Sequence, residues 1–342
     1  MTQAATRRTP TLEDVAEAAG VSRATVSRVV NKKGTVDEGL RRRVLEAIDA
    51  TGYVPNAAAR TLVNRRTGTI ALVMSGSDGS AAQVFADPFF GRITGGVVTY
   101  LRERAMHPTL MLADSDQARQ DALDFVRRGN ADGAILVSTH AGDPLPRLFV
   151  DAGVPAVLFA RPADPVPISF VDLDHEAGAA LAAAHLAERG CRRIATIAGP
   201  ADLPAAIGRL SGFQRAMERH GVPYVHVARG NFTADSGERA MAELLAMDPE
   251  LDGVFAANDL MAVGALRVLR DHGRSVPDDV ALIGFDDSEP AQLTRPRLTT
   301  VYQPVEQMSA EMGAMLVALL ADPDTPPSSV IFDPRLIVRE SA

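Results

Sequence analysis

The sequence predicts an all-α helix-turn-helix head with a hinge helix, followed by an α/β body of two doubly wound parallel-sheet subdomains. Three observations predict this. Short helical patterns fill the chain before residue 54, and short apolar runs alternate with amphipathic segments after residue 67. The charge is also uneven: the 342 residues carry −8, but residues 1–66 hold 12 Lys and Arg against 7 Asp and Glu. A basic head on an acidic body concentrates the attraction for phosphate in one part of the chain.

The first helix of the head is predicted from its two ends. Thr11 followed three residues later by Asp14 is the pattern of a capping box, in which each side chain bonds the backbone of the other residue. Val15 and Ala19 belong to its apolar stripe, and Gly20 supplies the left-handed residue that ends a helix. A short helix therefore begins near Thr11 and ends at Gly20.

A second helix follows after a tight turn, because Ser22 can cap it at once. In the stretch VSRATVSRVV, residues 21–30, the valines form the apolar side and the other residues leave a polar, basic face. A third helix is predicted from about Asp37 to Ala50, with Gly52 after it. Two short helices joined by a glycine turn and packed on a third form a helix-turn-helix. The exposed basic helix would then lie in a major groove.

The head is followed by a segment that has two interpretations. Pro55 breaks the preceding structure, Asn56 can cap a new helix, and residues 57–62 are too few for a helix that is stable alone. The segment is either a hinge helix or a linker with incidental helicity. The predicted division is residues 1–54 for the head, 55–66 for the hinge and 67–342 for a body whose two subdomains the chain connects more than once.

The body is predicted from its alternating pattern. Its apolar runs include TIALVM, TLMLAD, GAILVS, PAVLFA, RIATIAG, GVFAAN and VALIGFD, and helical segments such as FGRITGGVVTYLRER and LMAVGALRVLRDHG fall between them. Buried strands alternating with helices indicate a parallel, doubly wound sheet. The strands are too many for one compact unit, so two subdomains are expected, with a ligand between them at the carboxyl ends of the strands.

Several kinds of function are disfavoured by the composition and motifs. Cys191 is the only cysteine, which excludes an intrachain disulfide and a thiolate metal cluster. The sequence contains no phosphate-binding loop, nucleophile elbow or zinc-helix pattern, so we expect no catalytic residues, no cofactor and no metal. The N-terminus has no apolar signal-peptide core, and no apolar run approaches transmembrane length. We expect a cytoplasmic protein with no membrane partner.

The head and the body together resemble one family. The stretch TLEDVAEAAGVSRATVSRVVNKKGTVDEGLRRRVLEAIDATGYVPNAAARTL resembles the DNA-binding head and hinge of the lactose/galactose repressor (LacI/GalR) family. Further landmarks follow over nearly the whole chain: DPFFGRITGGV, RLSGF, AANDLMAVGAL, SVPDDVALIGFDD, RPRLTTVYQP and RLIVRES. The resemblance implies a body similar to periplasmic sugar-binding proteins, which binds an effector and dimerises. It implies a transcriptional regulator, in the first place a repressor of carbohydrate-metabolism genes that a small sugar releases from its operator.

The resemblance also implies which residues contact DNA. Arg23, Ala24 and Arg28 match the positions that read bases, where an arginine can bond guanine with two hydrogen bonds and alanine can make only apolar contact. The residues suited to phosphate are Ser22, Thr25, Ser27, Asn31 and the basic run 41–43. In the hinge, the expected contacts are Asn56, Ala59 and Leu62. Leu62 would act as an apolar wedge in the minor groove, and Ala59 is small enough for close approach.

An effector pocket is expected from strand ends and from the resemblance. Asp286 and Asn258 each end a predicted strand, where ligands of such sheets bind. Arg209 matches the family's ligand-binding arginine, and Phe232 falls where the family often has a stacking aromatic. The other subdomain would close the pocket with Asp87 and Phe89. Three further residues are expected to have ordinary structural roles: Asp259 and Asp287 as helix caps, and His175 as a surface or structural histidine.

Two alternatives to the sugar-released repressor remain open at this point. In the first, the ligand is a corepressor of the nucleobase or nucleoside type that strengthens DNA binding. In the second, the protein is a sugar-processing enzyme tethered to DNA, which turnover of a candidate effector would reveal. A head this small cannot select a long site alone, so we expect a homodimer on a near-palindromic double-stranded operator.

Overall fold

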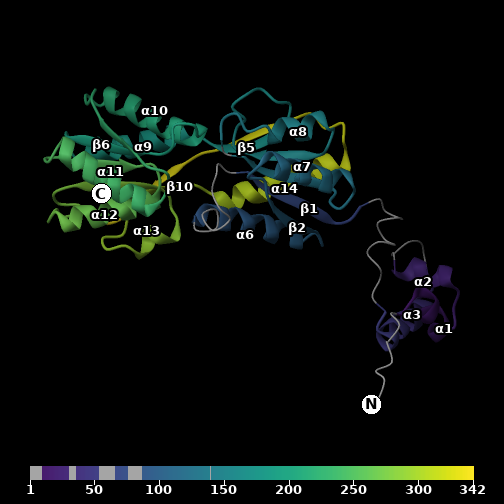
Figure 1. The fold of residues 1–342 in the computed structure, drawn as a ribbon. Helices are drawn as coiled ribbons and strands as arrows, with labels where there is room; N and C mark the ends of the chain where they lie inside the picture. Colours follow the sequence, from purple (N-terminus) through teal and green to yellow (C-terminus); the bar gives the residue numbers. More distant parts are fainter. Residues whose placement is uncertain (1–9, 31–35, 54–65, 76–86, 139) are drawn as a thin grey trace, which may run out of the picture. The chain divides into compact units, whose positions relative to one another are not determined.

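The computed structural model describes residues 10–30, 36–53, 66–75, 87–138 and 140–342 (Figure 1). The chain divides into two compact units, Met1–Thr67 and Gly68–Ala342. The predicted hinge helix, residues 57–62, lies outside the described residues.

The head contains three helices, α1 (Leu12–Ala19), α2 (Arg23–Val30) and α3 (Glu38–Thr51). The predicted capping box is confirmed, because Thr11 and Asp14 exchange side-chain to backbone hydrogen bonds. Gly20 ends α1 with a φ of 62°, in the left-handed region that favours glycine. The core of the head consists of Val15, Ala16, Ala19, Val26, Val44, Ala47 and Tyr53.

The second and third helices begin where the sequence predicts. The hydroxyl of Ser22 accepts a hydrogen bond from the backbone N–H of Thr25, which satisfies one donor of the first turn of α2. Asp37 caps α3 in the same way through Leu40, and Gly52 ends it in the left-handed conformation. The three-helix arrangement of a helix-turn-helix is therefore confirmed.

The body contains two sheets, as predicted. In the described residues, the first has the strand order β11 (Ser329–Phe332), β5 (Ser169–Leu173), β4 (Ala156–Phe159), β3 (Gly133–Ser138), β1 (Thr69–Ser75), β2 (His107–Leu112). The second has the order β12 (Arg335–Ile337), β10 (Thr299–Tyr302), β9 (Ala281–Asp286), β8 (Gly253–Ala256), β6 (Ile194–Ala198), β7 (His226–Arg229). The central strands carry fully buried side chains such as Leu72, Ile135, Phe255 and Phe285.

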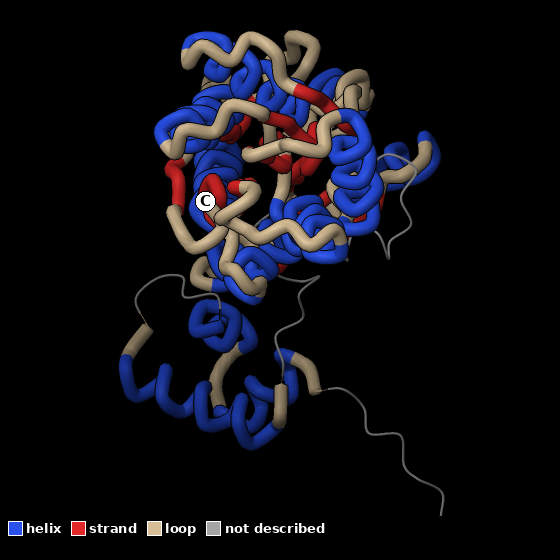
Figure 2. Tube along the Cα trace, turned by 90° about the vertical axis from the view of Figure 1, so that its left-hand side faces the viewer, coloured by secondary structure: helices blue, strands red, loops and turns tan. Residues whose placement is uncertain are grey.

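Helices cover the strands, which lie in the interior of the body (Figure 2). The first subdomain, built on the sheet of β1, carries α6 (Pro88–Arg102), α7 (Asp116–Arg127), α8 (Leu145–Asp151) and α14 (Val305–Ala321). The second subdomain, built on the sheet of β6, carries α9 (His175–Glu188), α10 (Pro204–Arg219), α11 (Ala234–Met247), α12 (Asp259–Asp271) and α13 (Glu289–Leu293). None of the described helices is long and apolar enough to span a membrane.

The chain passes between the subdomains from β5 to α9, from β10 to α14 and from β11 to β12. The strand pairs are parallel except β10 with β12, which is antiparallel. The exception has a simple cause: β12 follows β11 after two residues, with no helix to return the chain to the other end of the sheet. The crossings bring the carboxyl ends of the two sheets toward the same region.

Candidate functional site

Helix α2 presents most of the predicted DNA-contact side chains to solvent. Ser22, Arg23, Ala24 and Arg28 are exposed, whereas Thr25 and Ser27 are half-buried. Arg23 lies 3.0 Å from the carboxylate of Glu13 on α1, and both side chains are largely exposed, at 68% and 59%. Such a pair contributes little to stability, so Arg23 can exchange this partner for another acceptor at low cost.

Two of the other residues predicted to contact DNA form hydrogen bonds within the head, and four lie outside the described residues. The hydroxyl of Ser22 is already bonded to Thr25, with their oxygens 3.0 Å apart. Arg43 donates to the carbonyl of Ala19 at 2.6 Å, so it holds the end of α1 against α3. Asn31, Asn56, Ala59 and Leu62 fall outside the described residues.

The body holds a cavity of about 490 Å³ between its two subdomains. Its walls include Phe89, Phe159 and Arg161 from the first subdomain and His175, Arg209 and Gln303 near the second. Phe89 and Phe159 meet edge to face, with ring centroids 5.3 Å apart. Of the six predicted effector residues, Phe89 and Arg209 line this cavity, whereas Asp87, Phe232, Asn258 and Asp286 are not among its lining residues.

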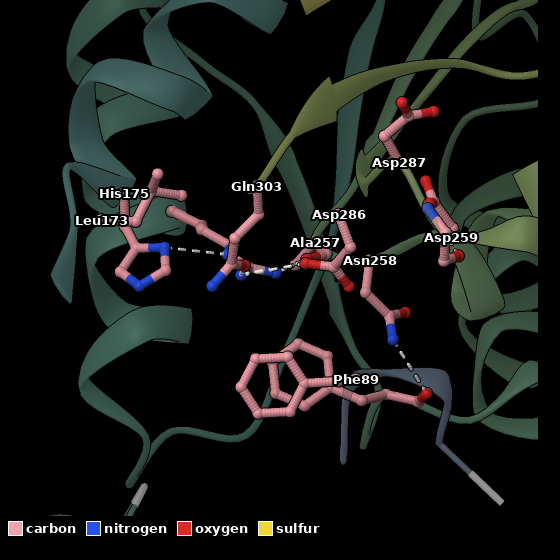
Figure 3. A network of polar contacts seen from close by, with 12 residues as sticks. Phe89, Leu173, His175, Ala257, Asn258, Asp259, Asp286, Asp287 and Gln303 are labelled. Carbon is pink, nitrogen blue, oxygen red and sulfur yellow. Dashed lines mark hydrogen bonds and ion pairs between the residues drawn. The ribbon is translucent and has the colours of Figure 1, made fainter. Parts of the chain in front are cut away.

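Arg209 is the centre of the polar wall. It projects from α10 with only 5% of its surface exposed, and its guanidinium lies 3.7 Å from the ring centroid of Phe285. It donates to the carbonyl of Ala257 and, at 3.1 Å, to the side-chain oxygen of Gln303. The carboxylate of Asp286 lies 3.2 Å away. Figure 3 shows Ala257, Asp286 and Gln303 gathered around these contacts. A buried arginine with fixed partners is a pre-oriented donor for a ligand.

His175 also belongs to the cavity wall, although the sequence indicated an ordinary surface or structural residue. Its side chain is 11% exposed, and its Nδ1 accepts a hydrogen bond from Nε of Arg209 at 3.3 Å. Its Nε2 lies 3.5 Å from the carboxylate of Asp172. Burial lowers the pKa of His175, and the donor at Nδ1 places the single proton of the neutral ring on Nε2.

Two cap predictions next to the site are wrong. The cap of α12 is Asn258 rather than Asp259: its oxygen accepts from the N–H of Met261 at 2.9 Å, and its amide donates to the carbonyl of Phe232 at 3.0 Å. Ser288, not Asp287, stands at the start of α13. Both aspartates have other partners because each lies one residue away from the position with extended backbone that a cap requires.

Asp259 is instead a wholly buried acceptor. Its carboxylate accepts hydrogen bonds from the N–H and the hydroxyl of Ser288 and from the hydroxyl of Thr300. Burial raises the pKa of Asp259 to about 7, more than these donors lower it. Burial likewise raises the pKa of Asp286 to about 6, against the attraction of Arg209. Figure 3 shows Asp259 and Asp287 beyond Asp286 as seen from His175.

Asp87 and Phe232 each interact with a residue of the cavity wall: Asp87 with Phe89 and Phe232 with Arg209. Asp87 caps α6 by accepting from the N–H of Phe89 at 2.9 Å, which fixes the start of the helix that carries Phe89. Burial raises the pKa of Asp87, while Arg209 lowers it. Phe232 has a φ of 65°, and its ring lies 6.0 Å from the guanidinium of Arg209. Positive φ in an aromatic residue is uncommon and is sustained here by the packing around it.

Sequence reasoning missed Gln303 and Arg92. Gln303 is 1% exposed and lies where the chain leaves β10 for α14. Arg92, on α6, donates to the carbonyls of Asp286 at 2.9 Å and of Gln303 at 3.0 Å. Neither residue ends a predicted strand, the signal that indicates Asp286 and Asn258.

Comparisons with known proteins agree with the fold. Residues 11–56 match the family described as "Bacterial regulatory proteins, lacI family", and residues 183–342 match "Periplasmic binding protein-like domain". The chain is 46% identical over 340 residues to the HTH-type transcriptional regulator CelR of Thermobifida fusca, covering 98% of this chain and 99% of that protein. It is 32% identical over 336 residues to the ribose operon repressor of Escherichia coli (strain K12), covering 97% and 99%.

Solved structures show the same similarity. A transcriptional regulator CelR–cellobiose complex superimposes with a TM-score of 0.76 and 43% identity over 97% of this chain and 100% of that one. The lac repressor dimer bound to operator and the anti-inducer ONPF gives a TM-score of 0.85 and 25% identity over 98% and 99%. The chain therefore belongs to the LacI family of bacterial regulatory proteins and is a DNA-binding transcriptional regulator rather than an enzyme.

Proposed function

We propose that this regulator represses carbohydrate-metabolism genes in the cytoplasm and leaves its operator when a glucose-type disaccharide, with cellobiose as the first candidate, enters the cavity of the body. The observation that carries the proposal is the buried Arg209, held in place beside the aromatic pair Phe89 and Phe159 in a cavity of about 490 Å³. Pockets for small ligands commonly measure about 300–1,000 Å³. The similarity to a regulator solved with cellobiose supports the choice of sugar.

The chemistry of the walls suits a sugar. A pyranose ring has an apolar C–H surface, which packs on aromatic faces such as those of Phe89 and Phe159, and a rim of hydroxyls. Arg209 and Gln303 offer fixed polar groups to those hydroxyls, and His175 lines the same wall. Asp286 acts indirectly, because its carboxylate holds the guanidinium of Arg209 in place. Arg161, an exposed residue of the cavity lining, is a further donor for the hydroxyls of a second ring.

In the head, Arg23 and Arg28 are the proposed base readers of α2, and Ala24 is the proposed apolar contact. The remaining polar residues on and around α2 would position the helix on the phosphates. One α2 helix reads only a few base pairs, so the proposed functional unit is a dimer on a two-fold operator. Exposed apolar residues Val98 on α6 and Leu110 on the edge strand β2 are available to such a contact. Light scattering should give a mass about twice 36.2 kDa.

The proposed mechanism is a difference in ligand affinity between two arrangements of the subdomains. A sugar held by both walls binds one closure angle better than the other, and only that difference can shift the equilibrium. The first subdomain follows the proposed hinge directly in the chain. A change in its position would keep the two hinge segments of the dimer from pairing in the minor groove. Operator affinity would then fall by a coupling energy of about 1–3 kcal/mol.

The test combines calorimetry with DNA binding. Purified full-length protein is titrated with cellobiose, glucose, ribose and hypoxanthine, and its affinity for a duplex selected from a random pool is measured with and without each compound. We expect cellobiose to bind and to weaken duplex binding. Tighter duplex binding with hypoxanthine would favour the corepressor alternative instead. No binding of cellobiose would overturn the disaccharide assignment.

A further inference from the structure

Arg92 joins the two subdomains. It lies on α6 of the first subdomain, and its side chain is 18% exposed. One guanidinium nitrogen donates to the carbonyl of Asp286, which ends β9 of the second subdomain, at 2.9 Å. Another donates to the carbonyl of Gln303, at the crossing from β10 to α14, at 3.0 Å. Both acceptors belong to residues whose side chains contact Arg209.

Arg92 and Arg209 therefore hold the same two residues from different sides. Arg209 contacts the side chains of Asp286 and Gln303, at 3.2 and 3.1 Å. Arg92 contacts their backbone carbonyls. Asp286 has a φ of 105°, a conformation that costs free energy and persists only where the surrounding structure enforces it. The bond from Arg92 to its carbonyl is one of the contacts that fixes this backbone, and with it the carboxylate that orients Arg209.

The position of Arg92 is set within the first subdomain. Its guanidinium forms an ion pair with Glu306 in the first turn of α14, with distances of 2.7 and 2.9 Å. The pair is possible because α6 and α14 pack closely: a Cβ on Gly96 would lie 2.6 Å from the Cβ of Ser309. Burial alone would lower the pKa of Arg92, but the carboxylate of Glu306 and the other nearby acidic groups raise it above its ordinary value. The guanidinium is charged at every physiological pH. The ion pair stays within one subdomain, whereas the bond to Asp286 spans two.

We propose that Arg92 is a positioning residue that couples the arrangement of the subdomains to the state of the effector site. The inference rests on the proposed effector function. A movement of the second subdomain would leave the pair with Glu306 intact and break the bond to the carbonyl of Asp286, since only the latter crosses between moving parts. Arg92 thus favours the arrangement seen here, in which Asp286 and Gln303 hold Arg209 ready for ligand. Its contribution differs between the two arrangements, which is the requirement for coupling.

The test compares Arg92→Met, Arg92→Lys and a control, Arg102→Met, in the full-length protein. Arg102 is exposed at the end of the same helix, so its loss removes an equal charge and leaves the network intact. The probes are cellobiose and the duplex selected by the wild-type protein. For Arg92→Met we expect cellobiose affinity to fall about tenfold, the effect of losing a charged hydrogen bond. We also expect duplex affinity without cellobiose to change by several fold in the opposite direction, because one equilibrium controls both.

The second measurement separates coupling from local damage. Arg92→Lys keeps the charge beside Glu306 but cannot form the fork of bonds to two carbonyls, so it should lie between wild type and Arg92→Met. Glu306→Gln, at a side chain that is 52% exposed, is a variant with little risk to folding and should shift both affinities in the same directions by less. Weaker cellobiose binding with unchanged duplex affinity would mean that Arg92 only shapes the pocket, and would overturn the proposal.

Failure of the cellobiose assignment can be distinguished from failure of the coupling proposal. If the wild-type protein does not bind cellobiose, the change in ligand-free duplex affinity of Arg92→Met against Arg102→Met still decides the coupling. A change of several fold supports it, and equal affinities of the two variants reject it. A shift toward weaker duplex binding would also support coupling, with the arrangement seen here as the DNA-binding one.

Discussion

The carboxylate of Asp286 and the guanidinium of Arg209 lie 3.2 Å apart, and both side chains are almost completely buried. Asp286 is not part of the cavity wall, whereas Arg209 is. In this ion pair the cation, Arg209, lines the cavity, and the anion, Asp286, contacts the cation without lining the cavity. A buried pair of this kind specifies the geometry of the group that faces the ligand more than it adds to stability.

Asp286→Ala should abolish the response to effector while leaving operator binding within about twofold of wild type. The substitution leaves Arg209 buried without its carboxylate, which typically destabilises a protein by about 3–5 kcal/mol. It keeps the backbone carbonyl that Arg92 binds. The measurement is fluorescence anisotropy of a labelled operator over a cellobiose titration.

Two further variants serve as comparisons. Asp286→Asn, which can still accept a hydrogen bond from Arg209, should respond at higher cellobiose concentrations. The control Asp271→Ala, at an exposed position, should match wild type. Release of DNA by Asp286→Ala at the wild-type concentration would contradict this role.

Arg28→Ala should have the opposite effect. Arg28 is exposed on α2, and a bidentate bond from arginine to guanine is worth about 1–3 kcal/mol of discrimination. We expect specific binding to fall toward the nonspecific level, with cellobiose binding unchanged. Arg41→Ala, at an exposed position on α3, is the comparison: a phosphate contact there should weaken all duplexes alike and reduce the salt dependence. Equal losses on specific and random duplexes for Arg28→Ala would show that it does not read bases.

Leu62→Ala tests the hinge, which lies outside the described residues. An intercalating wedge costs a few kcal/mol per unstacked step and bends the duplex. The variant should therefore lose specific affinity and bending, while its nonspecific, salt-dependent binding stays nearly unchanged. Circular-permutation gel shifts measure the bend. If affinity and bending both survive, residues 57–62 act only as a linker.

The stability of the body should depend on the protonation of Asp259. Burial raises the pKa of Asp259 from 3.8 to about 7, so the folded state binds a proton that the unfolded state has already released. This contribution to the free energy of unfolding is complete below pH 4 and is lost as the pH rises toward about 7. Asp259→Asn keeps an uncharged group of the same shape beside Ser288 and Thr300. It should flatten the decline of the unfolding midpoint between pH 4 and 7. Identical slopes for variant and wild type would show that Asp259 does not cause the decline.

Local sequence signals determined the head. The capping box of Thr11 and Asp14, the cap at Ser22 and the left-handed Gly20 each act over a few residues, so their outcome hardly depends on the rest of the chain. The buried strands of the body are also predicted from local sequence. Short, continuous apolar runs that alternate with helices are typical of strands buried on both faces of a parallel sheet. Strand ends then indicated where Asp286 and Asn258 would lie.

The tertiary structure decided which of these residues form the wall. Asn258 ends its strand as predicted, yet both polar groups of its amide are bonded within the second subdomain. Conversely, His175, Gln303 and Arg92 carry no local signal, and they meet Arg209 or its partners because the chain crosses between subdomains. A contact between residues 211 positions apart, such as Arg92 and Gln303, depends on how two sheets and their connections pack, which periodicity and capping do not encode. Local pattern thus predicts the helices, the strands and the edge of each sheet beside the cavity, whereas the packing of the two subdomains selects the side chains that line it.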